Sequence, residues 1–153
     1  IENCIAPLSS NEAVVYGVDL AKSVDWTVVI GLDSEGVVSY YDRFQLDWEH
    51  TERRVMSAIG TESALIDSTG VGDPIFERLN RQNPLIEGLA VAIQNREIGY
   101  PEGVISQELS DFEYVYTRTG TKYSAPDGLH DDAVCALALA LHKFRNQPTF
   151  GIW

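Results

Sequence analysis

A valine-rich apolar run at residues 13–21 constrains the fold more than any other feature, because it suits a strand buried on both faces of a sheet. Two further runs of strand length follow, at residues 26–32 and 37–44, and an Asp-Ser-Glu-Gly turn at 33–36 separates them. Because the connections are short, we expect these three strands to form an antiparallel meander.

Beyond the meander the apolar spacing becomes that of a helix at residues 48–59. The expected apolar face of this helix consists of Trp48, Val55, Met56 and Ile59. A second buried strand is expected at residues 63–67, directly before a turn that contains glycine. A strand on the far side of a helix indicates a sheet with helices packed on it.

The rest of the chain continues this alternation. Apolar residues at helical spacing predict helices that begin after Asp73-Pro74, lie within residues 85–93 and lie within residues 105–112. Residues 112–125 alternate aromatic and polar side chains, which predicts a β-hairpin. An alanine-rich helix is expected at residues 131–144. The order of elements predicts one mixed α/β domain.

Length and cysteine content agree with a single domain. The chain has 153 residues, and we divide it into a tail or linker stub at 1–12, a domain at 13–146 and a tail at 147–153. No apolar run approaches the ~20 residues of a membrane span. Cys4 in the loose amino-terminal segment and Cys135 in the last helix are not expected to pair, which fits a reducing cytosol.

The charge of the chain argues against a protein that binds nucleic acid on its own. Eleven basic residues stand against 23 acidic residues, which gives a net charge of −12. Proteins that bind nucleic acid unaided normally carry a basic excess. Any function that involves DNA must explain this charge.

Carboxylates stand at three places that apolar sequence would bury. Asp19 and Asp67 end two predicted buried strands, and Asp131 and Asp132 begin the last helix. If the strands that end in Asp19 and Asp67 are parallel neighbours, their carboxylates meet at one edge of the sheet, where α/β proteins place their sites. Such an oxygen cage would bind hard divalent cations, and two metals about 3.5–4 Å apart stabilise a phosphodiester displacement. The alternative is structural, since each aspartate could form a turn or cap a helix.

Six motifs, in order along nearly the whole chain, resemble the nuclease domain of phage large terminase subunits. They are YGVDLA (16–21), DWT (25–27), LIDSTG (65–70), IEGL (86–89), YSAP (123–126) and LHDDAV (129–134). The resemblance implies a ribonuclease H-like fold and a two-metal endonuclease that cuts concatemeric viral DNA in the cytoplasm of the infected bacterial host. It also implies that double-stranded DNA, an ATPase motor domain, the small terminase subunit and the capsid portal are partners.

The same resemblance assigns roles to residues. Asp19, Asp67 and Asp132 would be the catalytic ligands of Mg²⁺ or Mn²⁺, and Asp131 or His130 would assist them as an auxiliary ligand or orienting group. Lys22, Arg118 and Lys122 are the basic residues expected to contact DNA; for Arg118 and Lys122, solubilising an exposed hairpin is the alternative. Asp132 is preferred to Asp131 because the residues three and four positions after it, Cys135 and Ala136, are small enough to pack against a sheet.

Two features depart from the family. No phosphate-binding motif GxxxxGK[ST] occurs, so the motor half is not in this sequence. The family also has a strand and a polar loop between two helices that residues 81–84 join directly here. Metals that neutralise the carboxylates, together with DNA contacts from the motor half and the portal, would answer the objection from net charge.

Three other functions remain open from the residues alone. A junction resolvase or transposase-like nuclease would share the acidic cluster but needs a basic or dimeric face. An actin-like or sugar-kinase ATPase lobe also ends its first strand in an aspartate, but it needs a second lobe. The third is a non-catalytic docking module of the packaging motor that keeps the fold.

Overall fold

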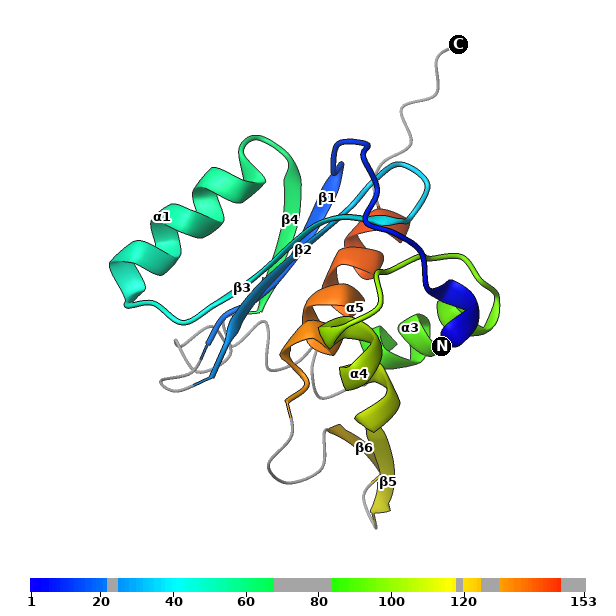
Figure 1. Cartoon of the computed structure of the whole chain (residues 1–153). Coiled ribbons are helices and arrows are strands. Elements are labelled where there is room, and N and C mark those ends of the chain that lie inside the picture. The colour runs from blue at the N-terminus through cyan, green and yellow to red at the C-terminus, as the bar shows by residue number, and fades with distance from the viewer. Residues whose placement is uncertain (22–24, 68–83, 118–119, 125–129, 147–153) are drawn as a thin grey trace.

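The fold is built on one mixed sheet, as a computed structural model shows (Figure 1). The structure describes the chain except for residues 22–24, 68–83, 118–119, 125–129 and 147–153. The helix predicted after Asp73-Pro74 and the connection at 81–84 lie wholly or largely among those exceptions.

The four strands of the sheet lie in the order β3-β2-β1-β4. They are β1 (Val15–Asp19), β2 (Thr27–Leu32), β3 (Val38–Phe44) and β4 (Ser63–Asp67). β2 pairs antiparallel with both β1 and β3, which confirms the predicted meander, and β4 adds to the other side of β1 in parallel. A parallel neighbour is possible because α1 (Trp48–Ile59) separates β3 from β4 along the chain.

Alternate residues of the strands face two different layers. Tyr16 and Val18 of β1 pack with Val55 and Ile59 of α1 on one face. On the other face, Val15 packs in the larger core with α3 (Pro84–Gln94), α4 (Val104–Asp111) and α5 (Asp132–Arg145). Among the described elements, Figure 1 shows α1 on one side of the sheet and these three helices on the other.

The close approach of α5 to β1 depends on a glycine. A Cβ atom on Gly17 would lie 2.0 Å from the carbonyl oxygen of Ala136 and 2.3 Å from the backbone nitrogen of Ala140. Real Cβ atoms do not approach backbone atoms so closely, so only glycine fits between the strand and the helix. Alanines on α5 complete this fit, since Ala133, Ala136 and Ala140 are all buried.

The other elements agree with the sequence pattern. α1 and β4 have the bounds predicted for them, and α5 is shifted by one residue from 131–144. The predicted hairpin consists of β5 (Glu113–Thr117) and β6 (Gly120–Ser124), paired antiparallel. No described helix is long and apolar enough to cross a membrane.

Two local expectations are wrong. The segment before β1 is not loose around Cys4: a short 3₁₀ helix (Glu2–Cys4) places this buried thiol in the core, and backbone hydrogen bonds join Cys4 and Ala6 to Tyr100. Trp48 and Met56 were expected on the buried face of α1, but they are 54% and 63% exposed. The 1–12, 13–146 and 147–153 division stays a prediction.

Candidate metal centre

Asp19 and Asp67 lie side by side at one edge of the sheet. They end the parallel strands β1 and β4 and are direct partners in the register, where neighbouring strands are about 4.8 Å apart. Both belong to the set of alternate residues that faces α5, as Gly17 and Leu65 do. The backbone nitrogen of Leu20 donates a hydrogen bond to the carbonyl oxygen of Asp67 at 3.1 Å, which fixes the two strand ends together.

The amino end of α5 brings two more carboxylates to the same place. Asp131 is the N-cap residue of the helix, and Asp132 is its first residue. The thiol of Cys135 lies one turn further along α5. Burial raises the pKa of this thiol, and the charges of four carboxylates raise it further: Asp19, Asp131, Asp67 and Asp132. The four predicted aspartates are therefore all near enough to Cys135 to act on its thiol.

Asp132 is the most perturbed of these carboxylates. It is 8% exposed, and its buried Oδ2 atom has no hydrogen-bond partner among the residues that the structure describes. Burial, together with the charges of Glu108, Asp131 and Asp25, raises the pKa of Asp132 to about 6. His130, the predicted auxiliary residue, lies beside it with Nδ1 3.6 Å from Oδ2, which is too long for a hydrogen bond. A buried carboxylate crowded by other carboxylates is a group that a cation would stabilise.

Glu108 of α4 holds the amino end of α5. Its Oε2 atom accepts hydrogen bonds from the backbone nitrogens of Ala133 at 2.7 Å and Val134 at 3.3 Å. These are donors that an N-cap side chain normally satisfies, and the Asp131 side chain makes no such bond. The structural alternative for Asp131, a side-chain cap, is therefore not what the structure shows.

Sequence reasoning missed Glu108, Asp25 and Arg43. Glu108 is 6% exposed, with its Oε1 atom buried and without a hydrogen-bond partner. The guanidinium of Arg43 lies 3.9 Å from the centre of the Trp26 ring and lowers the pKa of Glu108, although burial raises that pKa overall. A charged residue at position 108, between the apolar residues Ile105 and Leu109, is the signal that could have found it.

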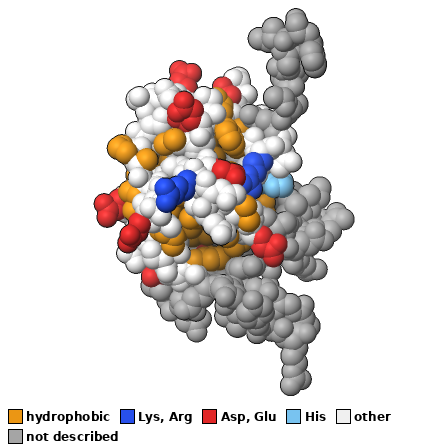
Figure 2. Space-filling model, turned by 90° about the vertical axis from the view of Figure 1, so that its right-hand side faces the viewer, with side chains coloured by type: hydrophobic (Ala, Val, Ile, Leu, Met, Phe, Trp, Pro, Cys, Tyr) orange, Lys and Arg blue, Asp and Glu red, His pale blue; other side chains and the backbone are white. Residues whose placement is uncertain are grey.

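The DNA contacts predicted for three basic residues stay a prediction. Lys22 and Arg118 lie outside the described residues, and Lys122 lies in β6. On the side of the molecule shown in Figure 2, the described side chains form no continuous basic patch, and acidic and basic groups are scattered. The objection from a net charge of −12 therefore stands for this face.

The donor set fits a hard divalent cation better than zinc. Aspartate oxygens dominate the group, and His130 supplies the nearest predicted nitrogen ligand. Among the described residues, however, no three His, Cys, Asp or Glu side chains are already arranged around one point.

The architecture defines a class of protein. A mixed sheet with an antiparallel meander and a parallel fourth strand, with helices on both faces, is the ribonuclease H-like fold. Carboxylates from the two parallel strands and from the helix beside them gather at one edge of that sheet.

Solved structures similar to this chain include large terminase nucleases. The large terminase nuclease from thermophilic phage G20c with bound magnesium has a TM-score of 0.72 and 27% sequence identity, over 88% of this chain and 83% of that one. The same nuclease with bound cobalt has a TM-score of 0.73 and 24% identity, over 93% and 94% of the two chains. The Thermus phage P74-26 large terminase nuclease domain has a TM-score of 0.68 and 24% identity, over 90% and 83%.

These likenesses confirm the resemblance that the six motifs indicate. No protein-family model and no curated protein matches the chain. The similarity of this chain to terminase nuclease domains is therefore a similarity of structure.

Proposed function

We propose that this chain is the metal-dependent endonuclease domain of a phage large terminase, which cuts concatemeric double-stranded DNA. The observation that carries the proposal is the pairing of Asp19 with Asp67 in parallel register, on the face where α5 presents Asp132. The raised pKa of Asp132, beside other carboxylates at one edge of the sheet, favours a functional site over three unrelated turn residues.

The proposed ligands are Asp19, Asp67 and Asp132, with Asp131 or His130 in an auxiliary role. Mg²⁺ or Mn²⁺ bound there, as a pair, would activate water and stabilise the charge that develops on the scissile phosphate. Solved relatives with bound magnesium and cobalt support a divalent cation. The buried Oδ2 atom of Asp132, which lacks a hydrogen-bond partner, supports a cation near this carboxylate.

The residues of the chain position these ligands. The register of β1 and β4 sets Asp19 beside Asp67, and Gly17 lets α5 approach the sheet closely enough to add Asp132. Glu108 holds the first turn of α5 in place through its two hydrogen bonds to the backbone. Small displacements of catalytic groups are costly in rate, so such support is part of the site.

The proposed partners follow from the terminase relationship. Double-stranded DNA would be the substrate, and an amino-terminal ATPase domain, a small terminase subunit and the portal would supply most of the grip on DNA. A net charge of −12 agrees with weak intrinsic DNA affinity. Weak binding would also restrain cutting outside the assembled motor, in the cytoplasm of the infected host.

One assay tests the proposal. Supercoiled plasmid is incubated with the parent chain and with Asp67→Asn, with Mn²⁺, with Mg²⁺ and with EDTA. We expect nicking and linearisation by the parent with metal, and none by Asp67→Asn or in EDTA. Cutting that survives EDTA would rule out the metal mechanism. A folded parent that never cuts would favour the docking module, which the absence of a ready ligand cage among the described residues also suits.

A further inference from the structure

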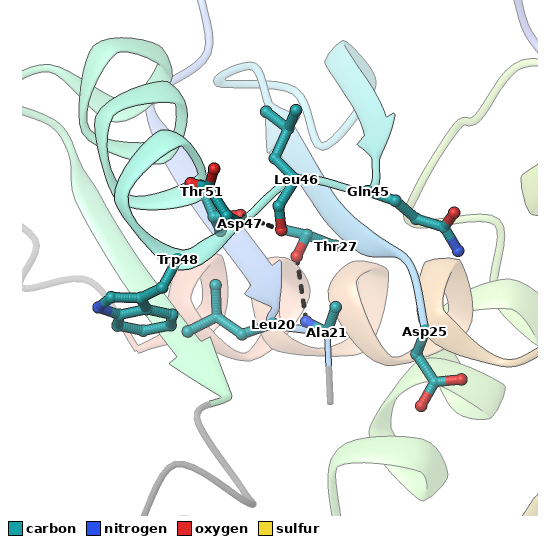
Figure 3. Close-up of a pocket in the computed structure, with 9 residues that line it drawn as sticks. All are labelled: Leu20, Ala21, Asp25, Thr27, Gln45, Leu46, Asp47, Trp48 and Thr51. Atoms are coloured by element: carbon teal, nitrogen blue, oxygen red, sulfur yellow. Dashed lines mark hydrogen bonds between the residues drawn. The ribbon is translucent and has the colours of Figure 1, made fainter. Parts of the chain in front are cut away.

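A cleft opens directly beside the acidic edge of the sheet (Figure 3). It has a volume of about 630 Å³ and lies between the end of β1, the start of β2 and the loop that leads into α1. One wall carries the exposed apolar residues Leu46 and Trp48, and Figure 3 shows the indole of Trp48 near the side chain of Leu20. The motifs singled out in the sequence assign no role to this wall.

Hydrogen bonds fix the frame of the cleft. The backbone nitrogen of Ala21 donates to Oγ1 of Thr27 at 3.0 Å, and Oγ1 of Thr51 donates to the carbonyl oxygen of Leu46 at 3.3 Å. Oδ1 of Asp47 accepts from the backbone nitrogen of His50 at 2.9 Å and so caps α1. The wall that carries Leu46 and Trp48 is therefore anchored at both ends.

The apolar wall is exposed where a folded chain would normally bury it. Trp48 is 54% exposed and Leu46 is 47% exposed, although the pattern of α1 predicts that Trp48 is in the core. The two residues flank the N-cap residue of α1, and Figure 3 shows their side chains pointing in different directions. An exposed tryptophan on a fixed rim is suited to an aromatic partner.

The cleft lies at the same end of the sheet as the proposed metal centre. Leu20 and Ala21, which line it, directly follow Asp19, and the backbone of Leu20 is bonded to Asp67. Asp25, on the opposite wall, acts electrostatically on Asp132. A DNA strand whose phosphate reached the aspartates would therefore place a neighbouring nucleotide at this cleft.

The charged side chains among the described residues of the cleft are two carboxylates, Asp25 and Asp47. A phosphate would be repelled by these carboxylates. A nucleobase is uncharged, has a flat face, and stacks on an exposed aromatic ring without regard to sequence.

We propose that this cleft binds a nucleobase of the strand being cut, next to the scissile phosphate, with Trp48 as its stacking platform. The inference rests on the proposed function in taking DNA as the substrate. Because a base in a duplex is already stacked, the cleft favours DNA that is single-stranded or locally unpaired at this point.

The test compares two exposed apolar residues of the same helix. Trp48→Ala, Trp48→Phe and the control Met56→Ala are each made in the Asp67→Asn chain, so that DNA is bound in Mg²⁺ without being cut. Met56 is 63% exposed and does not line the cleft. Binding of a fluorescently labelled oligothymidylate is followed by anisotropy at low salt, and thermal melts check that each variant is folded.

We expect Trp48→Ala to weaken binding of the oligothymidylate by about five- to 150-fold, the range that loss of one stacked base implies. Trp48→Phe should keep most of the affinity, and Met56→Ala should keep all of it. Equal affinities for Trp48→Ala and its Asp67→Asn parent would overturn the inference, as would an equal loss in Met56→Ala.

The outcome is separate from that of the proposed function. If the parent cuts plasmid with Mn²⁺ and Trp48→Ala changes neither cutting nor DNA binding, the proposed nuclease function is supported and the base site is refuted. If oligothymidylate binding depends on Trp48 but the parent never cuts DNA, the base site is supported and the proposed nuclease function is refuted.

Discussion

Asp132→Asn should stabilise the metal-free chain at neutral pH. Asp132 has a pKa of about 6 in the folded chain, against its ordinary value of 3.8, because it is buried among other carboxylates. The folded state therefore binds a proton more readily than the unfolded state, and stability falls as the pH rises from about 4 through 6. A shift from 3.8 to about 6 corresponds to about 3 kcal/mol, which asparagine, a neutral side chain of the same shape, would recover.

The size of this gain depends on pH in a way that can be measured. Urea unfolding in EDTA should show Asp132→Asn more stable than the parent by up to about 3 kcal/mol at pH 7.5. At pH 5 the carboxyl of the folded parent is mostly protonated already, so the gain should fall to about 1.5 kcal/mol. A stability gain that shrinks as the pH falls is specific to a carboxylate with a raised pKa.

Asp33 supplies a matched control of opposite sign. It is also a buried aspartate; burial would raise its pKa, but hydrogen bonds from Ser9 and from the backbones of Val37 and Glu35 outweigh burial and lower it. Its carboxylate stabilises the fold above pH 3.8, so Asp33→Asn should destabilise the chain at both pH values. A loss of stability in Asp132→Asn at pH 7.5, or an equal gain at both pH values, would refute the electrostatic reasoning.

Three further outcomes are expected. Gly17→Ala should cost about 3 kcal/mol or more in urea unfolding, because the new Cβ would collide with the backbone of Ala136; unchanged stability would contradict the packing of β1 on α5. Glu108→Ala should lower stability by about 1–2 kcal/mol through loss of the helix cap, whereas Glu108→Gln keeps an acceptor and should lose less; equal losses would mean that the cap is unimportant. Mn²⁺ should raise the melting temperature of the parent, by the equivalent of about 2.7 kcal/mol at 100 times its Kd, and that of Asp67→Asn much less; equal shifts would indicate general binding to an acidic surface.

The sheet and its two paired aspartates could be predicted because they follow from local patterns. Strand-length apolar runs that end in Asp19 and Asp67 show where each carboxylate stands relative to its strand. The helix between β3 and β4 then permits the parallel neighbour that joins them. Both steps need only the period of the side chains and the length of the connections.

The rest of the site could not be predicted because it depends on how distant elements dock. Glu108 is an ordinary helical glutamate in the sequence, and only the packing of α4 against α5 puts it on the backbone of Ala133. The prediction that Trp48 is buried is wrong for a different reason. The period of α1 assigns Trp48 to the core, but only the middle and end of the helix contact the sheet. Periodicity identifies a face, but it does not say how far along that face the neighbour extends.

The packing around Gly17 offsets the repulsion among the carboxylates at the acidic edge of the sheet. Carboxylates crowded around the first turn of α5 oppose folding in the absence of a cation, so the helix must be held by other means. Three features hold α5 against the sheet: the contact at Gly17, the buried alanines of the helix and the cap by Glu108. None of them is a proposed metal ligand. Natural proteins commonly sacrifice stability at a functional site and recover it in the surrounding core. On the proposed function, the same arrangement explains how a chain with a net charge of −12 could act on DNA: the cation that relieves the repulsion among the carboxylates also removes much of the local barrier to the phosphate.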